Sequence, residues 1–342
     1  MKRRLERRLV IWVSLLIAIS GHAFAQPRLE KFPFRLNWTA SGEHAPFFVA
    51  RDKGFYRDEG LEVEILDGSG SSTVLQLIAN GTSPVAYADA ATMMRGVVNG
   101  MPVRAVGVPL QRSPHAFIYR ADAPRPTKIS ELKGSRIAVT AGDASMTIFS
   151  ALLGKAGLKP EDVQLITVAN TAAKDQAVLN RQADAIMGFF MDQGVRLEPQ
   201  TGVKIGYTTL HEMAGLSTLS SAIIAGNEWL KDAKNQDLTR RFLRATQRGW
   251  QYSADNRREA AEIFVKAKPS IALAIALGTL EGAMTLTRTE RTRDSPVNWS
   301  SGEDWKDTQD LLAKYANLKP QPDLGIYYTN SYLSEAPYLP KK

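Results

Sequence analysis

Apolar and polar positions alternate with two different periods along this chain. Leucine, valine and isoleucine alternate with Glu62 and Glu64 over residues 61–66, which is the period-two pattern of a strand with one buried face. The next apolar run, 73–79, has helical spacing and stops at the pair Asn80-Gly81, a helix-ending signal. Strand-like and helix-like segments continue to alternate to residue 190, which predicts an α/β architecture.

The predicted elements fall into two groups along the chain. Strands are expected at 34–38, 61–66, 85–88, 103–108, 136–140, 164–168, 185–190 and 221–225. Helices are expected at 45–56, 73–79, 90–99, 146–156, 172–180, 238–253, 257–266 and 305–316. Pro124 and Pro126 within 121–128 indicate a crossing between two lobes. We therefore expect a first lobe at 26–121, a second lobe at 122–220, and a return to the first lobe with the C-terminal helices at 221–342.

The first 25 residues have the three-part pattern of a cleaved export signal. Five basic residues against Glu6 are followed by an apolar run at 9–19 and by Ala23-Phe24-Ala25, a small-x-small cleavage pattern. The alternative is a membrane anchor, but the apolar run is shorter than the ~20 residues that a spanning helix needs. We expect cleavage near Ala25/Gln26 and export from the cytoplasm.

Much of the net charge belongs to this signal. The formal charge of +8 falls to +4 without it, because the signal holds five basic residues and one acidic residue. A local basic cluster, Arg240, Arg241, Arg244 and Arg248, lies on a helical pattern and is more typical of a solvated helix face. Since no dense basic stripe remains, nucleic acid is not an expected partner.

Cysteine is absent from the sequence. Its absence excludes disulfides, thiolate metal sites, cysteine nucleophiles and a lipid-modified cysteine at the cleavage site. The four histidines, His22, His44, His115 and His211, are scattered and lack a metal-binding spacing such as HExxH. We expect neither a metal nor a cofactor.

Several sequence blocks form a recognisable set. The blocks are Asn37-Trp38, His44-Ala45-Pro46-Phe47-Phe48-Val49-Ala50, Lys53-Gly54-Phe55-Tyr56, Glu59-Gly60-Leu61-Glu62-Val63, Gln76-Leu77-Ile78-Ala79-Asn80-Gly81, Ala86-Tyr87-Ala88-Asp89-Ala90, Leu132-Lys133-Gly134-Ser135-Arg136-Ile137-Ala138-Val139 and Gln182-Ala183-Asp184-Ala185. Together they resemble the SsuA/THI5-like (NMT1-type) family of solute-binding proteins. The resemblance covers nearly all of the mature chain, and its opening blocks between Asn37 and Val63 are quite specific.

This resemblance implies a type II periplasmic binding protein fold, with two α/β lobes, two hinge crossings and a ligand cleft between the lobes. It also implies a small solute as ligand, the permease of an ABC importer as partner, a periplasmic location and a monomeric state. The family includes binding proteins for sulfonates, taurine, nitrate and the aminopyrimidine precursor of thiamine.

Candidate ligand-binding residues follow the predicted strands, because small ligands of open α/β sheets bind beyond the carboxyl ends of strands. They are Trp38, Glu43, His44, Ser69, Gly70, Ser71, Asp89, Gly142, Asp143, Ala144, Ser145, Phe189 and Phe190. The two glycine-containing loops each precede a helix, where backbone amides favour anions or carbonyl groups. Trp38 offers a flat ring for stacking. A structural role is the alternative for each residue, above all for the lone His44, and one of the two phenylalanines should face the cleft.

The residue types at these positions favour one ligand chemistry. Glu43, Asp89 and Asp143 accompany Trp38, while no arginine or lysine sits at a predicted strand-end loop. Carboxylates accept hydrogen bonds from amino groups, whereas sulfonate or nitrate would benefit from cations. We therefore predict a planar, amino-bearing heteroaromatic such as a thiamine pyrimidine precursor, with sulfonates, nitrate and aromatic acids as alternatives.

Catalysis is not expected from the sequence. The resembled family also includes an iron-dependent thiamine pyrimidine synthase, whose motif is a cysteine-rich run that this chain lacks. No other catalytic spacing stands out. The expectation is that the protein is not an enzyme.

Overall fold

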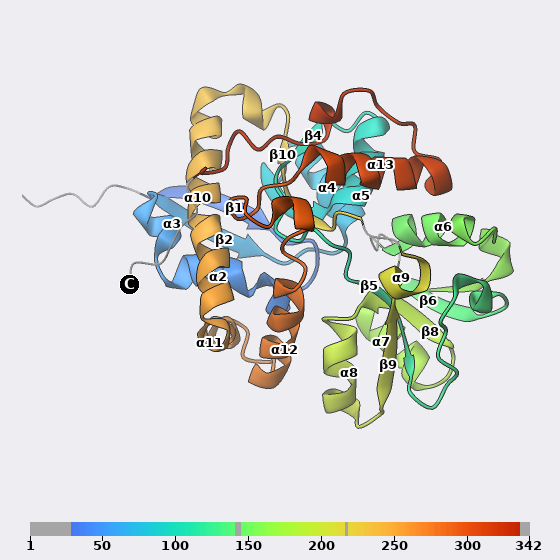
Figure 1. Ribbon diagram of the computed structural model, residues 1–342. Helices are drawn as coiled ribbons and strands as arrows, with labels where there is room; N and C mark the ends of the chain where they lie inside the picture. The colour runs from blue at the N-terminus through green and yellow to red at the C-terminus, as the bar shows by residue number, and fades with distance from the viewer. Residues whose placement is uncertain (1–28, 141–144, 216–217, 336–342) are drawn as a thin grey trace, which may run out of the picture.

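The computed structural model describes residues 29–140, 145–215 and 218–335, and it contains two five-stranded sheets (Figure 1). The first sheet has the order β2 (Leu61–Leu66), β1 (Glu30–Arg35), β3 (Val85–Asp89), β10 (Ser221–Gly226) and β4 (Val103–Gly107). The second has the order β7 (Gln164–Val168), β6 (Arg136–Thr140), β8 (Ala185–Phe189), β5 (His115–Arg120) and β9 (Ile205–Thr209). In each sheet the fourth strand runs antiparallel to both neighbours. We call the two halves the first and second lobes.

Helices cover both sheets. In the first lobe these are α2 (Ala45–Asp52), α3 (Phe55–Asp58), α4 (Ser71–Ala79), α5 (Ala90–Val98), α10 (Ala233–Asp255), α11 (Arg257–Ala267) and α12 (Leu273–Met284). In the second they are α6 (Ser145–Lys155), α7 (Thr171–Leu179), α8 (Gln193–Thr201) and α9 (Leu210–Ala214). The last helix, α13 (Gly302–Ala316), lies beside α6 in Figure 1 and packs against both α6 and α5. The architecture confirms the predicted two-lobed α/β fold.

Local differences from the predicted elements have identifiable causes. The predicted helix 45–56 is two helices, because Gly54 adopts φ +78°, a left-handed conformation that interrupts the helix. The first strand spans Glu30–Arg35 rather than 34–38, so Trp38 lies in the loop beyond it. Helices α8 and α12 and strands β5 and β9 were not predicted.

The first connection between the lobes runs ahead of the expected crossing. Strand β5, which the expected boundary at 121/122 assigns to the first lobe, pairs instead with β8 and β9 of the second sheet. The return connection lies between α9 and β10. We propose that the two crossings include residues 108–114 and residues 218–220, and that the lobes divide there.

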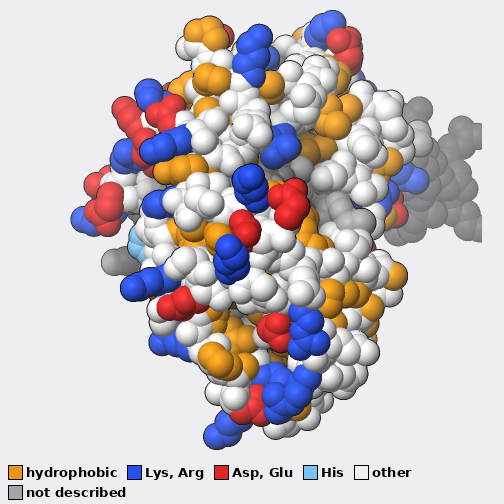
Figure 2. All heavy atoms as spheres, turned by 90° about the vertical axis from the view of Figure 1, so that its right-hand side faces the viewer, with side chains coloured by type: hydrophobic (Ala, Val, Ile, Leu, Met, Phe, Trp, Pro, Cys, Tyr) orange, Lys and Arg blue, Asp and Glu red, His pale blue; other side chains and the backbone are white. Residues whose placement is uncertain are grey.

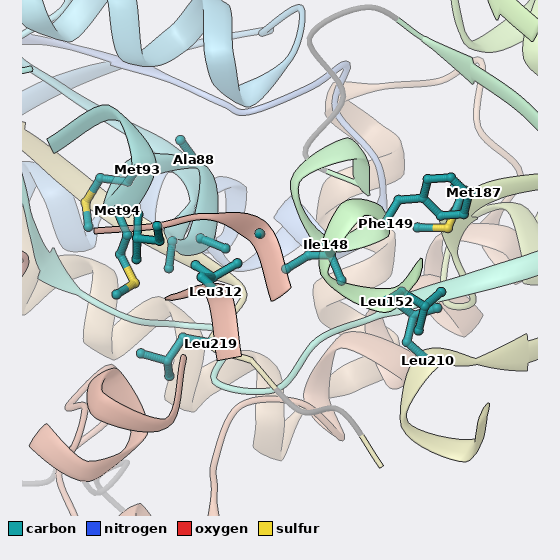
Figure 3. Close-up of a cluster of buried hydrophobic side chains, with 14 of the residues drawn as sticks. Ala88, Met93, Met94, Ile148, Phe149, Leu152, Met187, Leu210, Leu219 and Leu312 are labelled. Atoms are coloured by element: carbon teal, nitrogen blue, oxygen red, sulfur yellow. The ribbon is translucent and has the colours of Figure 1, made fainter. Parts of the chain in front are cut away.

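A hydrophobic cluster joins the two lobes (Figure 3). Met93 and Met94 of α5 belong to the same buried cluster as Ile148 and Leu152 of α6, and Leu312 of α13 lies between them. We expected the C-terminal helices to pack against the first lobe. Helices α10 and α11 do so through α2, whereas α13 bridges both lobes.

Charged side chains on the surface are mostly paired. Arg241, Arg244 and Arg248 of the basic cluster on α10 form ion pairs with Glu30, Glu59 and Asp58 respectively. Figure 2 shows acidic and basic side chains interspersed on another face of the molecule. Over the described residues, no helix combines the length and the apolar character that crossing a membrane requires.

Candidate functional site

A cavity of about 340 Å³ lies between the lobes. Its wall on the first lobe is the loop 37–44, which follows β1, together with Ser71. Its wall on the second lobe comes from the first turn of α7, the end of β8 and helix α8. Ile275 and Thr279 of α12, and Ile271 just before that helix, complete the lining. Residues from opposite sides of both crossings therefore face one space, as a hinged binding site requires.

The first lobe presents a fixed carboxylate. His44 is fully buried, its Nδ1 accepts a 3.0 Å hydrogen bond from the Ser41 backbone N–H, and its Nε2 lies 2.8 Å from Asn37 Oδ1 and 3.0 Å from Glu43 Oε1. Because Nδ1 is an acceptor, the proton belongs on Nε2. His44 thus orients Glu43, which leaves Glu43 Oε2 buried and without a hydrogen-bond partner among the described residues.

The second lobe presents another carboxylate beside a guanidinium. Asp175 Oδ2 lies 2.7 Å from Arg196, and Arg196 Nε lies 3.1 Å from Asp192 Oδ1. The other oxygen, Asp175 Oδ1, is buried and has no hydrogen-bond partner in the described parts of the chain. Burial raises the pKa of Asp175, and the neighbouring Arg196 opposes that rise.

Two cations line the cavity, whereas the sequence-based expectation found no arginine or lysine at a predicted strand-end loop. Lys174 is 2% exposed and donates a 3.0 Å hydrogen bond to the Met187 carbonyl, and Arg196 is held by its two aspartates. The expectation considered only strand-end loops, whereas both cations project from helices α7 and α8. Helical residues one or two turns from a strand end can therefore reach the same cavity.

Aromatic rings occupy both walls. Trp38 lines the cavity and donates a 2.8 Å hydrogen bond from Nε1 to Thr171 Oγ1 in the opposite lobe. Phe189, at the end of β8, also lines it and packs edge-on against His115 with ring centroids 5.0 Å apart. Phe190 does not line the cavity but stacks on Tyr207.

The first glycine-containing loop, with Gly68 and Gly70, supports the cavity wall, whereas its backbone amides were expected to contact a ligand. The backbone N–H groups of Gly68 and Gly70 donate to the Trp38 and Asn37 carbonyls, so they hold the cavity loop in place. Ser69 is exposed and outside the cavity, while Ser71 lines it and its Oγ accepts the Asp89 N–H at 3.0 Å.

The remaining candidates lie elsewhere or cannot be placed. Asp89 is the N-cap of α5, where its Oδ1 accepts from the Thr92 backbone and hydroxyl, and it does not line the cavity. Gly142, Asp143 and Ala144 lie outside the described residues. Ser145 begins α6, and its side chain is also outside the description.

Sequence reasoning missed most of the second-lobe wall. The missed residues include Thr171, Lys174, Asp175, Asp192, Gln193 and Arg196. Asp192 and Gln193 follow strand β8 within a few residues, so the strand-end argument could have found them. Asn170, whose side chain caps α7, marks the start of the helix that carries Thr171 and Asp175.

The fold belongs to the class of periplasmic binding proteins. The structure is similar to the aliphatic sulphonate binding protein SsuA from Escherichia coli, with a TM-score of 0.66, 14% identity, and 92% of this chain and 95% of that chain covered. It is also similar to a structure from Bordetella bronchiseptica, with a TM-score of 0.68, 22% identity, and 88% and 95% covered. At these identities the likeness establishes the fold alone.

Within that class, the family model described as NMT1/THI5 like matches residues 41–260, and the chain belongs to this family. A relative named riboflavin-binding protein RibY from Chloroflexus aurantiacus is 26% identical, with 92% of this chain and 89% of the relative covered. A relative from Legionella pneumophila, named 4-amino-5-hydroxymethyl-2-methylpyrimidine phosphate synthase, is 25% identical, with 89% and 92% covered.

These relatives correct the expectation that the protein is not an enzyme. Proteins with the synthase name, also from Uromyces fabae and Saccharomyces cerevisiae, are 24% to 29% identical to this chain. The missing cysteine motif excludes only chemistry that needs those thiols. It does not exclude catalysis, so the expectation that the protein is not an enzyme was wrong to rest on it.

Iron does not fit the residues that the structure describes. Among them, no three histidine, cysteine, aspartate or glutamate side chains are grouped closely enough to hold a metal ion. His44, the histidine of the cavity, uses Nδ1 to accept from Ser41 and Nε2 to contact Asn37 and Glu43. None of the roles proposed below therefore involves a metal.

Proposed function

We propose that this protein binds a small, planar, amino-bearing heteroaromatic solute, such as a thiamine pyrimidine precursor, in the cavity between its lobes. The observation that carries the proposal is that Glu43 and Asp175 line one cavity from opposite lobes, and that each has a buried carboxylate oxygen, Glu43 Oε2 and Asp175 Oδ1. Neither has a hydrogen-bond partner in the described chain.

Buried acceptors without donors are costly, at roughly 1–3 kcal/mol for a polar group and more for a charged one. A ligand that carries amino groups supplies the missing donors, because a carboxylate accepts hydrogen bonds and cannot donate them. Two acceptors on separate walls favour a ligand with two donor groups, such as the amino and hydroxymethyl groups of the pyrimidine.

The aromatic walls support a flat ligand. Trp38 and Phe189 are both partly exposed and line the cavity from different lobes. Aromatic side chains stack well on heteroaromatic rings. The names of two relatives, riboflavin-binding protein and aminopyrimidine phosphate synthase, both refer to nitrogen heterocycles.

The cations keep anionic solutes as alternatives. Lys174 and Arg196 are the cavity's candidates for contact with a sulfonate, nitrate or aromatic carboxylate. Three acidic and two basic side chains line the cavity. This balance favours the amino-bearing ligand over a simple anion.

Transport completes the proposal. A solute that contacts both walls binds the closed form best, so it shifts the lobes toward closure. We propose that the closed monomer docks on the permease of an ABC importer in the periplasm, after export by the signal in residues 1–25. The signal lies outside the described residues.

Calorimetry and thermal unfolding of the full chain, purified after export, test the ligand class. The panel consists of 4-amino-5-hydroxymethyl-2-methylpyrimidine, ethanesulfonate, nitrate and benzoate, each at matched ionic strength. We expect the pyrimidine alone to raise the melting temperature and to bind with one site per chain. Binding of ethanesulfonate or benzoate, with no response to the pyrimidine, would overturn the proposal.

The synthase names of several relatives favour a second candidate function, the formation of 4-amino-5-hydroxymethyl-2-methylpyrimidine phosphate in the same cavity. Lys174 and Arg196 would then hold the phosphate group. Mass spectrometry of cells that produce the wild-type chain and of cells that lack it tests this function. Accumulation of the pyrimidine phosphate with the wild-type chain, but not in cells that lack the chain, supports synthesis, and equal levels in these two exclude it.

A further inference from the structure

A second cavity, of about 350 Å³, lies beside the two crossings between the lobes. Gln111 and Arg112 of the first crossing line it, as do Thr218 and Leu219 of the return crossing. The remaining wall is the segment between α12 and α13 together with the first turns of α13. Among the described lining residues, none is shared with the ligand cavity.

Four arginines line this second cavity, and only two of them, Arg291 and Arg293, form ion pairs within the described residues. Arg291 forms ion pairs with Asp304 and Asp307, and Arg293 pairs with Glu290, so these cations are neutralised locally.

The other two arginines, Arg112 and Arg288, donate to backbone carbonyls instead. Arg112 donates to the Thr285 carbonyl, and Arg288 Nη1 donates to the Thr292 and Ser295 carbonyls at 2.7 and 2.5 Å. Neither guanidinium has a carboxylate within ion-pair distance in the described chain. Each retains N–H donors, since a guanidinium carries five.

A residue of the same cavity wall, Thr218, carries a buried hydroxyl. Thr218 is 3% exposed, lines the cavity, and its Oγ1 has no hydrogen-bond partner among the residues that the structure describes. The neighbouring polar groups are already used, because Thr308 Oγ1 accepts the Leu219 N–H and Thr292 Oγ1 donates to Gln111. An unused hydroxyl beside two carboxylate-free guanidiniums matches the donors that an oxyanion accepts.

We propose that this hinge cavity, lined by Arg112, Arg288 and Thr218, is a second binding site for a small oxyanion such as phosphate. An anion there contacts Arg112 of the first crossing and Thr218 of the return crossing. The hinge cavity is a different site from the solute cavity, because the two share no described lining residue. The half-buried position of Arg288 agrees with this assignment, since burial lowers the pKa of its guanidinium and a bound anion would offset that effect.

Inorganic phosphate is the probe, and isothermal calorimetry and thermal unfolding of the full chain are the measurements, against sodium chloride at the same ionic strength. We expect phosphate to raise the melting temperature of the wild-type chain. Arg288→Gln should weaken phosphate binding by roughly tenfold or more, because it removes a charged donor. Arg258→Gln, at an exposed arginine of α11, is the matched control and should bind like the wild type.

Two further variants keep the result interpretable. Thr218→Val changes no charge and little volume, and it should weaken phosphate binding by roughly threefold or more if the hydroxyl contacts the anion. Trp38→Ala, in the solute cavity, should leave phosphate binding unchanged. The proposal is overturned if phosphate acts no differently from chloride, if Arg288→Gln and Thr218→Val bind phosphate normally, or if Trp38→Ala abolishes the effect.

Discussion

The Trp38 indole donates a 2.8 Å hydrogen bond to the Thr171 hydroxyl, and this bond joins the two lobes at the edge of the solute cavity. Trp38 follows strand β1 of the first lobe, and Thr171 opens helix α7 of the second. The same ring therefore has two roles, one in the cavity wall and one in the contact between the lobes.

Replacing Thr171 by valine should loosen the closed state, because the indole N–H loses its acceptor while the side-chain shape is kept. We expect solute affinity to fall by roughly fivefold, which corresponds to about one hydrogen bond. Calorimetry measures the change, and Thr167→Val at an exposed threonine of β7 is the matched control. An unchanged dissociation constant would show that the bond does not favour closure.

Replacing Trp38 by alanine should have a larger effect. It removes the hydrogen bond together with the stacking surface, so we expect about a tenfold or greater loss of affinity. Trp229→Ala, at a tryptophan outside the solute cavity, serves as the comparison. Equal affinities of wild type and Trp38→Ala would remove Trp38 from the site.

Replacing Glu43 by glutamine tests the carboxylate chemistry. We expect roughly tenfold weaker binding of the aminopyrimidine, because the charged acceptor is lost, and no loss for anionic solutes. Glu281→Gln, at an exposed glutamate of α12, is the control. Calorimetric titration of the variant and the wild type with the pyrimidine and with ethanesulfonate measures both changes in affinity. Stronger binding of the pyrimidine by Glu43→Gln would contradict the proposed role of this side chain.

Closure also depends on two glycines of α12. A Cβ at Gly282 would lie 2.6 Å from Met191 Cβ of the second lobe, and one at Gly278 would lie 2.9 Å from Val195. Gly282→Ala should therefore keep the lobes apart and weaken solute binding by roughly tenfold, although alanine favours the helix itself. Small-angle scattering with saturating solute should show a larger radius than for Glu281→Ala, and identical radii would contradict this prediction.

The bridging cluster should control stability rather than binding. Leu312 of α13 is fully buried between α5 and α6, so Leu312→Ala should lower the free energy of unfolding by about 2–5 kcal/mol. Leu165→Ala, at a leucine that is 36% exposed, should cost much less. Urea unfolding measures both changes, and similar losses for the two variants would show that the bridge adds little.

The sequence predicted the elements whose pattern is local. The alternating residues of Leu61–Leu66 form a strand with alternating burial at its start, and the Asn80-Gly81 pair ends a helix. Strand β5 was missed because its residues are buried on both faces, so it lacks alternation and depends on its partners β8 and β9. Asp89 shows the opposite case, since it lies at the end of a strand, close to where it was predicted, but its side chain caps a helix.

By itself the sequence determined the two-lobed α/β fold, the family, and Trp38, Glu43 and His44 as candidates after the first strand, because short-range periodicity and contiguous motifs encode them. Only the tertiary structure decided which side chains share the cavity. Lys174, Asp175 and Arg196 lie more than a hundred residues from Glu43, and they meet it because two helices of the second lobe point at a loop of the first. Such a meeting depends on how the lobes pack, and no local pattern records it.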